Sequence, residues 1–172
     1  MSRIWIGALV AAVCAVVIAS TSTIGQNNAA QEAKDRVEIE SLMWHYARAL
    51  DTGNGAAYAA TYTVDGQFGT GANATKGREA LQKMVDGPRE QQADAKAQGT
   101  PARPPLYHME ANTWIEFIDK DHANYHAYYL TAAGAGGQNE PPRLAAAGRS
   151  VNHLQRVNGK WLIKVRDVAP QD

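Results

Sequence analysis

The sequence is poor in cysteine and has no excess charge of either sign. Its single cysteine, Cys14, lies in an N-terminal apolar segment, so the rest of the chain has no disulfide, no thiolate nucleophile and no cysteine metal ligand. Seventeen Lys and Arg residues balance seventeen Asp and Glu residues. Because binding to a phosphate backbone needs a basic excess, we expect no nucleic-acid partner.

Several cofactor and metal motifs are also absent. The chain has no glycine-rich phosphate loop and no Gly-x-Ser-x-Gly elbow, which argues against nucleotide cofactors and serine hydrolysis. His122 and His126 are four residues apart, but they fall on a predicted turn and strand without a carboxylate cluster. We therefore predict no metal site and no cofactor.

The N-terminus has the pattern of an export signal. After Arg3, an apolar run extends from Ile4 to Ala19, and small and polar residues follow it. This run is typical of a secretory signal peptide and is shorter than the roughly 20 residues that a membrane-spanning helix needs. We predict that residues 1–25 are a signal peptide, or alternatively an uncleaved anchor, and that the protein is periplasmic or secreted. Residues 26–172 are expected to form a single domain with no other membrane contact.

The first half of this domain has helical periodicity. Apolar residues at helical spacing from Ile39 to Leu50 predict an amphipathic helix that ends at Asp51. Shorter helices are predicted over residues 56–63 and 76–85, with a short strand over 67–70 between them. The polar, proline-containing segment 86–105 is interpreted as a long, mobile loop that could hold some helix.

The second half has the two-residue period of strands. Strands are predicted over residues 106–118, 123–131, 148–157 and 160–168, the last two joined by a tight turn at Asn158-Gly159. Strict alternation along the first of them places Trp114 on the same face as His108. Helices followed by consecutive antiparallel strands indicate an α+β fold, with helices packed on one face of a curved sheet that can enclose a small-molecule pocket.

Four segments of the chain resemble the SnoaL-like family of the nuclear-transport-factor-2-like superfamily. They are Tyr46-Ala-Arg-Ala-Leu-Asp51, Tyr107-His108, Tyr125-His126, and Asn152 to Trp161 followed by Arg166. The resemblance covers about residues 32–168, and it implies a cone-shaped α+β barrel. Within the family, the motifs are similar to those of scytalone dehydratase and hexachlorocyclohexane dehydrochlorinase. The superfamily includes isomerases, dehydratases, cyclases, hydrolases and non-catalytic proteins, so its fold does not fix an activity.

The resemblance implies a catalytic Asp–His dyad, which in this sequence would be Asp51 and His108. A neutral imidazole can take a proton from a carbon or a hydroxyl near pH 7. A carboxylate on its other nitrogen would fix the tautomer and stabilise the imidazolium. The residues by themselves are also compatible with a turn aspartate and a polar histidine on a half-exposed strand.

Three further residues are candidates for catalytic roles. Arg166 matches a pocket arginine of the dehydrochlorinase and could hold a leaving anion or a developing oxyanion; the alternative is a surface ion pair. His126 matches a second catalytic histidine of scytalone dehydratase, with a structural hydrogen bond as the alternative. Tyr46 stands where the dehydrochlorinase has a lysine, and Leu50 where scytalone dehydratase has a tyrosine, so the chain reproduces neither model fully.

Four apolar side chains are candidates to bind the substrate, with a place in the core as the alternative: Met43, Phe68, Trp114 and Tyr128. The function predicted is that of a cofactor-independent lyase, catalysing a dehydratase-like elimination, or an isomerase. Its substrate would be a small, apolar, cyclic or aromatic molecule. The alternative is a non-catalytic small-molecule-binding or assembly protein. Because the family often assembles through the outer face of the sheet, we expect a homodimer or homotrimer.

Overall fold

The computed structural model describes residues 28–100, 103–135 and 141–170. The predicted leader lies outside these residues, so export stays a prediction, which N-terminal sequencing of the protein recovered from cells would check. Within the described ranges, no helix is long and apolar enough to cross a membrane. The chain divides into two units, Met1–Val37 and Glu38–Asp172, and the fold given below is that of the second unit.

The described residues contain four helical segments. The N-terminal helix is described over residues 28–51 and ends where the sequence predicts. Helix α2, Gly55–Ala60, begins at Asn54, whose side-chain oxygen accepts a hydrogen bond of 3.0 Å from the backbone N–H of Ala57. A short 3-10 helix, Gly71–Asn73, is followed by helix α3, Arg78–Ala97.

The length of α3 corrects the prediction of a mobile loop over 86–105. Pro88 lies inside the helix but does not end it. The residues after it are mostly Ala, Gln, Glu, Lys and Arg, which have high helix propensity. Leu81 and Val85 bury the first half of the helix against the domain, and this packing supports the more exposed second half. Of the residues in this segment that the structure describes, only those after Ala97 lie outside the helix.

A single sheet of six strands forms the rest of the domain. The strands are β1 Tyr62–Phe68, β2 Thr75–Lys76, β3 Leu106–Phe117, β4 His122–Ala133, β5 Arg143–Val157 and β6 Lys160–Asp167. Their order is β2-β1-β6-β5-β4-β3, with β1 parallel to β6 and all other neighbours antiparallel. Strand β1 begins five residues before the predicted strand 67–70 and replaces the end of the predicted helix 56–63. The α+β fold with a mostly antiparallel, curved sheet is confirmed.

A β-bulge in β3 changes which residues face the helices. The pairing of β3 with β4 shifts between Ala111 and Trp114, and Asn112 has a positive φ of 49°. An extra residue in one strand reverses the alternation beyond it. Ile115, on the far side of the bulge, is therefore buried in the core, while Trp114 is exposed on the other face. The predicted strict alternation, which put Trp114 with His108, is wrong for this reason.

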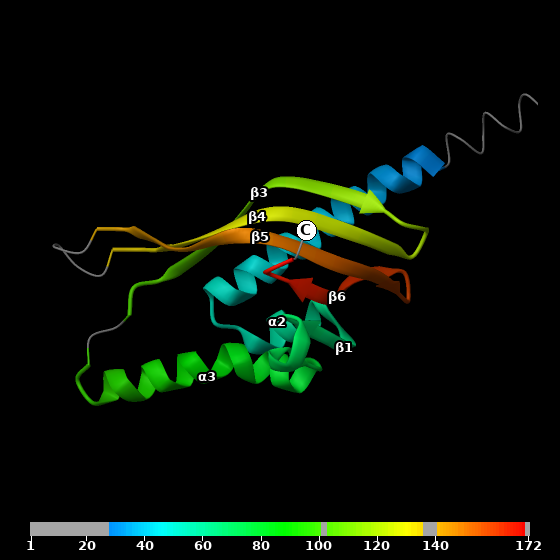
Figure 1. The fold of residues 1–172 in the computed structure, drawn as a ribbon. Coiled ribbons are helices and arrows are strands. Elements are labelled where there is room, and N and C mark those ends of the chain that lie inside the picture. The colour runs from blue at the N-terminus through cyan, green and yellow to red at the C-terminus, as the bar shows by residue number, and fades with distance from the viewer. Residues whose placement is uncertain (1–27, 101–102, 136–140, 171–172) are drawn as a thin grey trace, which may run out of the picture. The chain divides into compact units, whose positions relative to one another are not determined.

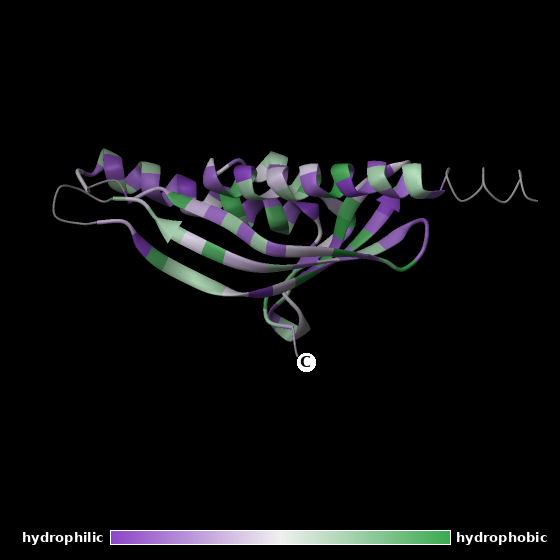
Figure 2. Cartoon of the chain, turned by 90° about the horizontal axis from the view of Figure 1, so that it is seen from above, coloured by the Kyte–Doolittle hydropathy of each residue, from purple (hydrophilic) through white to green (hydrophobic). Residues whose placement is uncertain are grey.

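The core of this unit lies between the helices and the inner face of the sheet. Figure 1 shows α2 and α3 on one side of the curved strands, and Figure 2 shows hydrophobic residues on the helical and strand segments that face each other. The side chains with the least exposure come from every layer: Ile39, Tyr58, Tyr62, Leu81, Leu154 and Ile163. Gly55 lets α2 approach α3 closely, because a Cβ at this position would lie 2.5 Å from the carbonyl oxygen of Gln82.

Candidate active site

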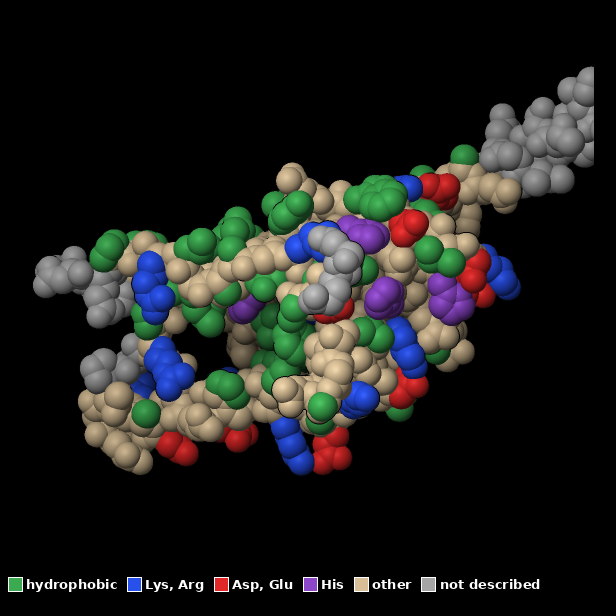
Figure 3. Space-filling view, in the orientation of Figure 1, with side chains coloured by type: hydrophobic (Ala, Val, Ile, Leu, Met, Phe, Trp, Pro, Cys, Tyr) green, Lys and Arg blue, Asp and Glu red, His purple; other side chains and the backbone are tan. Residues whose placement is uncertain are grey.

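A pocket of about 390 Å³ opens between α3 and the inner face of the sheet. Figure 3 shows this hollow with hydrophobic side chains inside it and Lys or Arg side chains at its edge. The lining comes from the N-terminal helix, α2, α3 and four strands or strand ends: Tyr46, Leu50, Tyr58, Phe68, Met84, Val85, Pro88, Leu106, His108, Tyr129, Thr131, Arg166 and Val168. Mostly apolar walls with a few polar groups are typical of small-molecule sites.

The structure brings Asp51 and His108 together at this pocket. The Asp51 carboxylate oxygen Oδ1 lies 2.8 Å from His108 Nδ1 and also accepts a 2.9 Å hydrogen bond from the backbone N–H of His108. Their side chains are 14% and 27% exposed, respectively. Because a carboxylate only accepts hydrogen bonds, Nδ1 carries the proton in the neutral imidazole. Nε2 is then the basic nitrogen, available to a molecule in the pocket.

Arg166 is held as a fixed charge in the pocket floor. One guanidinium nitrogen, Nη2, lies 2.7 Å from Glu110 Oε1, and Nη1 donates a 2.8 Å hydrogen bond to Asn152 Oδ1. The guanidinium carbon lies 4.4 Å from the centre of the Tyr46 ring. Burial would lower the pKa of the guanidinium, but the neighbouring Tyr46 and Glu110 raise it, so Arg166 stays protonated. The surface ion pair considered as its alternative is not what the structure shows.

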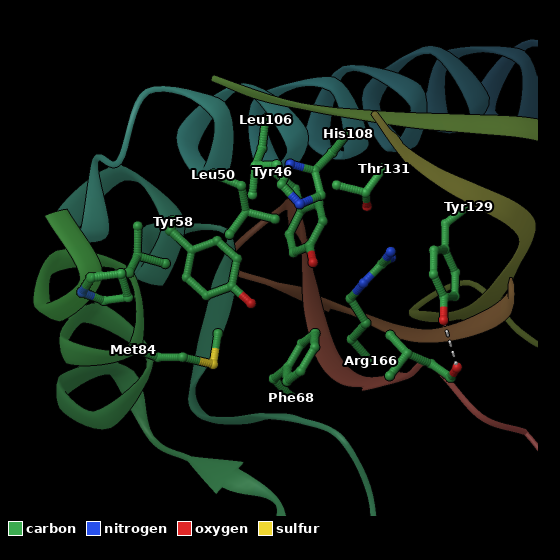
Figure 4. Close-up of a pocket in the computed structure, with 13 residues that line it drawn as sticks. Tyr46, Leu50, Tyr58, Phe68, Met84, Leu106, His108, Tyr129, Thr131 and Arg166 are labelled. Carbon is green, nitrogen blue, oxygen red and sulfur yellow. Dashed lines mark hydrogen bonds between the residues drawn. The ribbon is translucent and has the colours of Figure 1, made fainter. Parts of the chain in front are cut away.

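Three tyrosines form a buried cluster beside Arg166. The Tyr58 and Tyr62 hydroxyls are 2.9 Å apart, and the ring centres of Tyr46 and Tyr58 are 5.2 Å apart. Figure 4 shows the hydroxyl ends of Tyr46 and Tyr58 directed to the interior of the site. Burial raises the pKa of all three phenols, although the Arg166 charge lowers those of Tyr46 and Tyr62 in part. The phenols of Tyr46 and Tyr58 are therefore neutral, and a neutral hydroxyl can donate a hydrogen bond.

The cluster predicts a loss of stability at alkaline pH. In the folded state Tyr46, Tyr58 and Tyr62 have a pKa above the ordinary 10.0, so the folded protein keeps protons that the unfolded chain releases. The stabilisation is thus complete below about pH 10 and is lost as the pH rises further. We expect the urea midpoint to fall between about pH 9 and about pH 11, with phenolate absorbance from these residues developing only on unfolding. A Tyr58→Phe protein should show a shallower fall, and an unchanged midpoint in the wild type would contradict the prediction.

Several predicted site residues lie elsewhere. Trp114, Tyr128 and His126 do not lie where the sequence predicts, because they belong to the outer face of the sheet. There the Trp114 and His126 rings stack with their centres 4.9 Å apart. Trp114 and Tyr128 are more than half exposed, and none of the three lines the pocket. The bulge at Asn112 moves Trp114 to this face, and the pairing with β4 places His126 opposite it. Met43 is buried in the core cluster and does not line the pocket, whereas Phe68, Tyr46 and Arg166 do.

Other residues of the site were missed by the sequence analysis. Tyr58 stands in an alanine-rich segment with no motif around it, so nothing in the sequence marked it. Glu110 follows His108 by two residues on the same strand face, and Asn152 pairs with Arg166 in the register of β5 and β6. The alternation of β3 could have suggested Glu110, but its pairing with Arg166 depends on the curvature of the sheet. In the described part of the chain, no three His, Cys, Asp or Glu side chains are grouped so that they could hold a metal ion.

The chain is similar to known proteins of one family. A family model of the SnoaL-like domain matches residues 31–167. A Mycobacterium tuberculosis protein of unknown function is 20% identical, with a TM-score of 0.66 and coverage of 83% of this chain and 75% of the other. A proposed scytalone dehydratase from Novosphingobium aromaticivorans is 21% identical, with a TM-score of 0.64 and coverage of 84% and 89%. No protein of curated function matches the sequence.

One further similar structure contains a small molecule. It is a Catenulispora acidiphila protein in complex with S-DNPA, 21% identical to this chain, with a TM-score of 0.61 and coverage of 78% of this chain and 91% of the other. At such identities the similarity to these solved structures shows the fold alone. The family assignment rests on the family model, which covers most of the chain. This protein therefore belongs to the SnoaL-like domain family and has its nuclear-transport-factor-2-like fold.

Proposed function

We propose that this protein is a cofactor-independent lyase or isomerase that removes a proton from a small cyclic or aromatic molecule held in the pocket. The observation that carries this proposal is the Asp51–His108 pair at the wall of a mostly apolar cavity. The carboxylate fixes the imidazole tautomer and stabilises the imidazolium that forms on proton transfer. A neutral imidazole is suited to act as the base in such a proton transfer.

The chemistry that fits these groups is abstraction of a proton beside a carbonyl. His108 Nε2 takes the proton, and the electron pair of the C–H bond moves toward the carbonyl, which becomes an enolate. The neutral hydroxyls of Tyr46 and Tyr58 donate hydrogen bonds to the enolate oxygen. In an elimination, the enolate then expels a hydroxyl from the β carbon, and the His108 imidazolium returns the proton to that hydroxyl, which leaves as water. In an isomerisation, the imidazolium returns its proton to another carbon.

The charge of Arg166 acts on this step through Tyr46. Its guanidinium lies 4.4 Å from the centre of the Tyr46 ring, and at this distance its charge polarises the phenol. Glu110 balances the charge, and a hydrogen bond to Asn152 holds the guanidinium in place. A phenol next to a fixed positive charge is a better hydrogen-bond donor to a developing anion. Arg166 is therefore proposed as a positioning residue, and His108, Tyr46 and Tyr58 as the groups that touch the substrate.

The proposal is tested by hydrogen–deuterium exchange in a generic substrate. Aryl-fused cyclic ketones such as indanone are incubated with the protein in D₂O, and loss of the proton signal beside the carbonyl is followed by NMR. We expect exchange faster than in a solution of the heat-unfolded protein at the same concentration. If ketones bind, as judged by a rise in melting temperature, but none exchanges faster, the non-catalytic binding function is favoured and the enzyme proposal fails.

We also propose that the protein forms a homodimer or homotrimer through the outer face of β3, β4 and β5. This face exposes a set of large apolar side chains: Tyr107, Met109, Trp114, Tyr128, Leu130 and Leu144. An apolar surface of this kind marks an interaction site. We expect light scattering coupled to gel filtration to give an oligomer for the wild type and a monomer for Leu130→Glu. The exposed Val64 on β1 offers a matched control, since Val64→Glu should leave the mass unchanged. A monomeric wild type would contradict the proposal.

A further inference from the structure

A second cavity lies directly beside the catalytic pocket. It has a volume of about 410 Å³ and shares four lining residues with the first: Leu50, Val85, Pro88 and Leu106. Asp51 and Thr52 at the end of the N-terminal helix also line it. A molecule whose ring lies next to His108 can therefore extend into this outer cavity without leaving the protein surface.

The outer cavity differs from the inner one in its charge. Arg89 and Arg103 both line it, one from α3 and the other from the segment that leads into β3. The aliphatic part of Arg89 lies on Gly53, close enough that a Cβ there would be 3.1 Å from Arg89 Cδ. The side-chain amide of Gln92, one turn after Arg89, donates a hydrogen bond of 3.4 Å to the carbonyl oxygen of Arg103. These contacts place the Arg89 side chain and the Arg103 backbone at the same opening.

Neither guanidinium has an acidic partner among the residues that the structure describes. Asp51 is the one carboxylate lining the cavity within that part of the chain, and its Oδ1 already accepts two hydrogen bonds from His108. The outer cavity thus keeps a net positive charge, whereas Arg166 in the inner pocket is balanced by Glu110. A guanidinium without an acidic partner can hold a carboxylate by two parallel hydrogen bonds.

We infer that the substrate of this site is an acid: an apolar ring in the inner pocket joined by a short chain to a carboxylate held by Arg89 and Arg103. This inference rests on the proposed function for the placement of the ring next to His108. It adds to the proposed function that the substrate carries a carboxylate. The catalytic residues do not specify this group, because proton abstraction by His108 requires no anion on the substrate.

The test compares acids with matched neutral molecules in binding, not in turnover. Phenyl- and naphthyl-substituted acetic, propionic and butyric acids are titrated into the protein by calorimetry, alongside the primary alcohols of the same length. We expect at least one acid to bind about 10-fold tighter than its alcohol, since charge-assisted hydrogen bonds are roughly twice as strong as neutral ones. Because the arginines are exposed to solvent, this preference should shrink at high salt.

Variants of α3 and the following segment separate the arginines from a general charge effect. Arg89→Gln and Arg103→Gln should each reduce the preference for the acid, and together abolish it, while leaving the affinity for the alcohol unchanged. Lys96→Gln removes a positive charge from the same helix outside both cavities and should leave the preference intact. If no acid binds better than its alcohol, or if Lys96→Gln lowers the preference as much as Arg89→Gln does, the inference is overturned.

The same titrations distinguish this inference from the proposed function. A His108→Gln protein should keep the preference for the acid, because the two arginines and not the base determine it. A protein that prefers acids but catalyses no exchange would retain the inference and lose the catalytic proposal. A protein that exchanges the protons of neutral ketones but shows no preference for acids would retain the catalytic proposal and overturn the inference.

Discussion

A His108→Gln protein is expected to exchange the protons of a cyclic ketone about 10²- to 10⁴-fold more slowly than the wild type, the range that general bases contribute. Glutamine fills a similar volume but has no basic nitrogen. The substitution should leave the site folded, because Asp51 Oδ1 also accepts a hydrogen bond from the backbone N–H of residue 108, which does not depend on the side chain. Ligand affinity, measured by calorimetry, should therefore change little while the exchange rate collapses.

A matched control exists in the same protein. His122 Nδ1 lies 2.9 Å from Asp119 Oδ1, so it forms an Asp–His pair like that of the pocket, but at the exposed start of β4 and outside both cavities. His122→Gln should have no effect on exchange, and equal losses in the two variants would point to a nonspecific cause. Asp51→Asn should also slow exchange, because an amide in this position no longer favours the tautomer with a free Nε2. If the His108→Gln protein exchanges protons at the wild-type rate, the catalytic proposal is incorrect.

The second large effect is expected at Glu110. Its side chain is 10% exposed and that of Arg166 is 5% exposed, with 2.7 Å between Oε1 and Nη2. A Glu110→Gln substitution keeps the shape but leaves the buried guanidinium without a counter-charge. Breaking a buried ion pair on one side costs about 3–5 kcal/mol. In a domain of this size, that corresponds to a fall in melting temperature on the order of 10 °C, measurable by calorimetry.

Two further variants make the result specific to the ion pair. Glu110→Leu combined with Arg166→Met removes both charges, so the double variant should regain most of the melting temperature lost by Glu110→Gln. Glu79→Gln breaks the exposed pair with Lys83 on α3, where solvent screens the charges, and should leave the melting temperature nearly unchanged. If the Glu110→Gln protein has the same melting temperature as the wild type, Arg166 does not need its buried partner, and the description of the pocket floor is incorrect.

Local patterns accounted for the helices and strands where one face is buried. The amphipathic stripe from Ile39 to Leu50 predicted the N-terminal helix, and the two-residue period predicted β3, β4, β5 and β6 within a few residues. The same reasoning failed where the pattern is interrupted. The second half of α3 is polar and follows Pro88, so its pattern predicts a loop although its residues favour a helix. The prediction for Trp114 failed because a single bulge reverses every position after it.

The sequence by itself determined the fold class, the family resemblance and the pair of residues to examine as base and orienting group. Tertiary structure decided which side chains share the pocket. Asp51 and His108 are 57 residues apart in the chain and meet because the end of the N-terminal helix lies against the start of β3. Arg166 meets Glu110 because β6 and β3 face each other across the curvature of the sheet, and the curvature and the bulge depend on how all the strands pair and pack. These arrangements are non-local, so no window of sequence contains them.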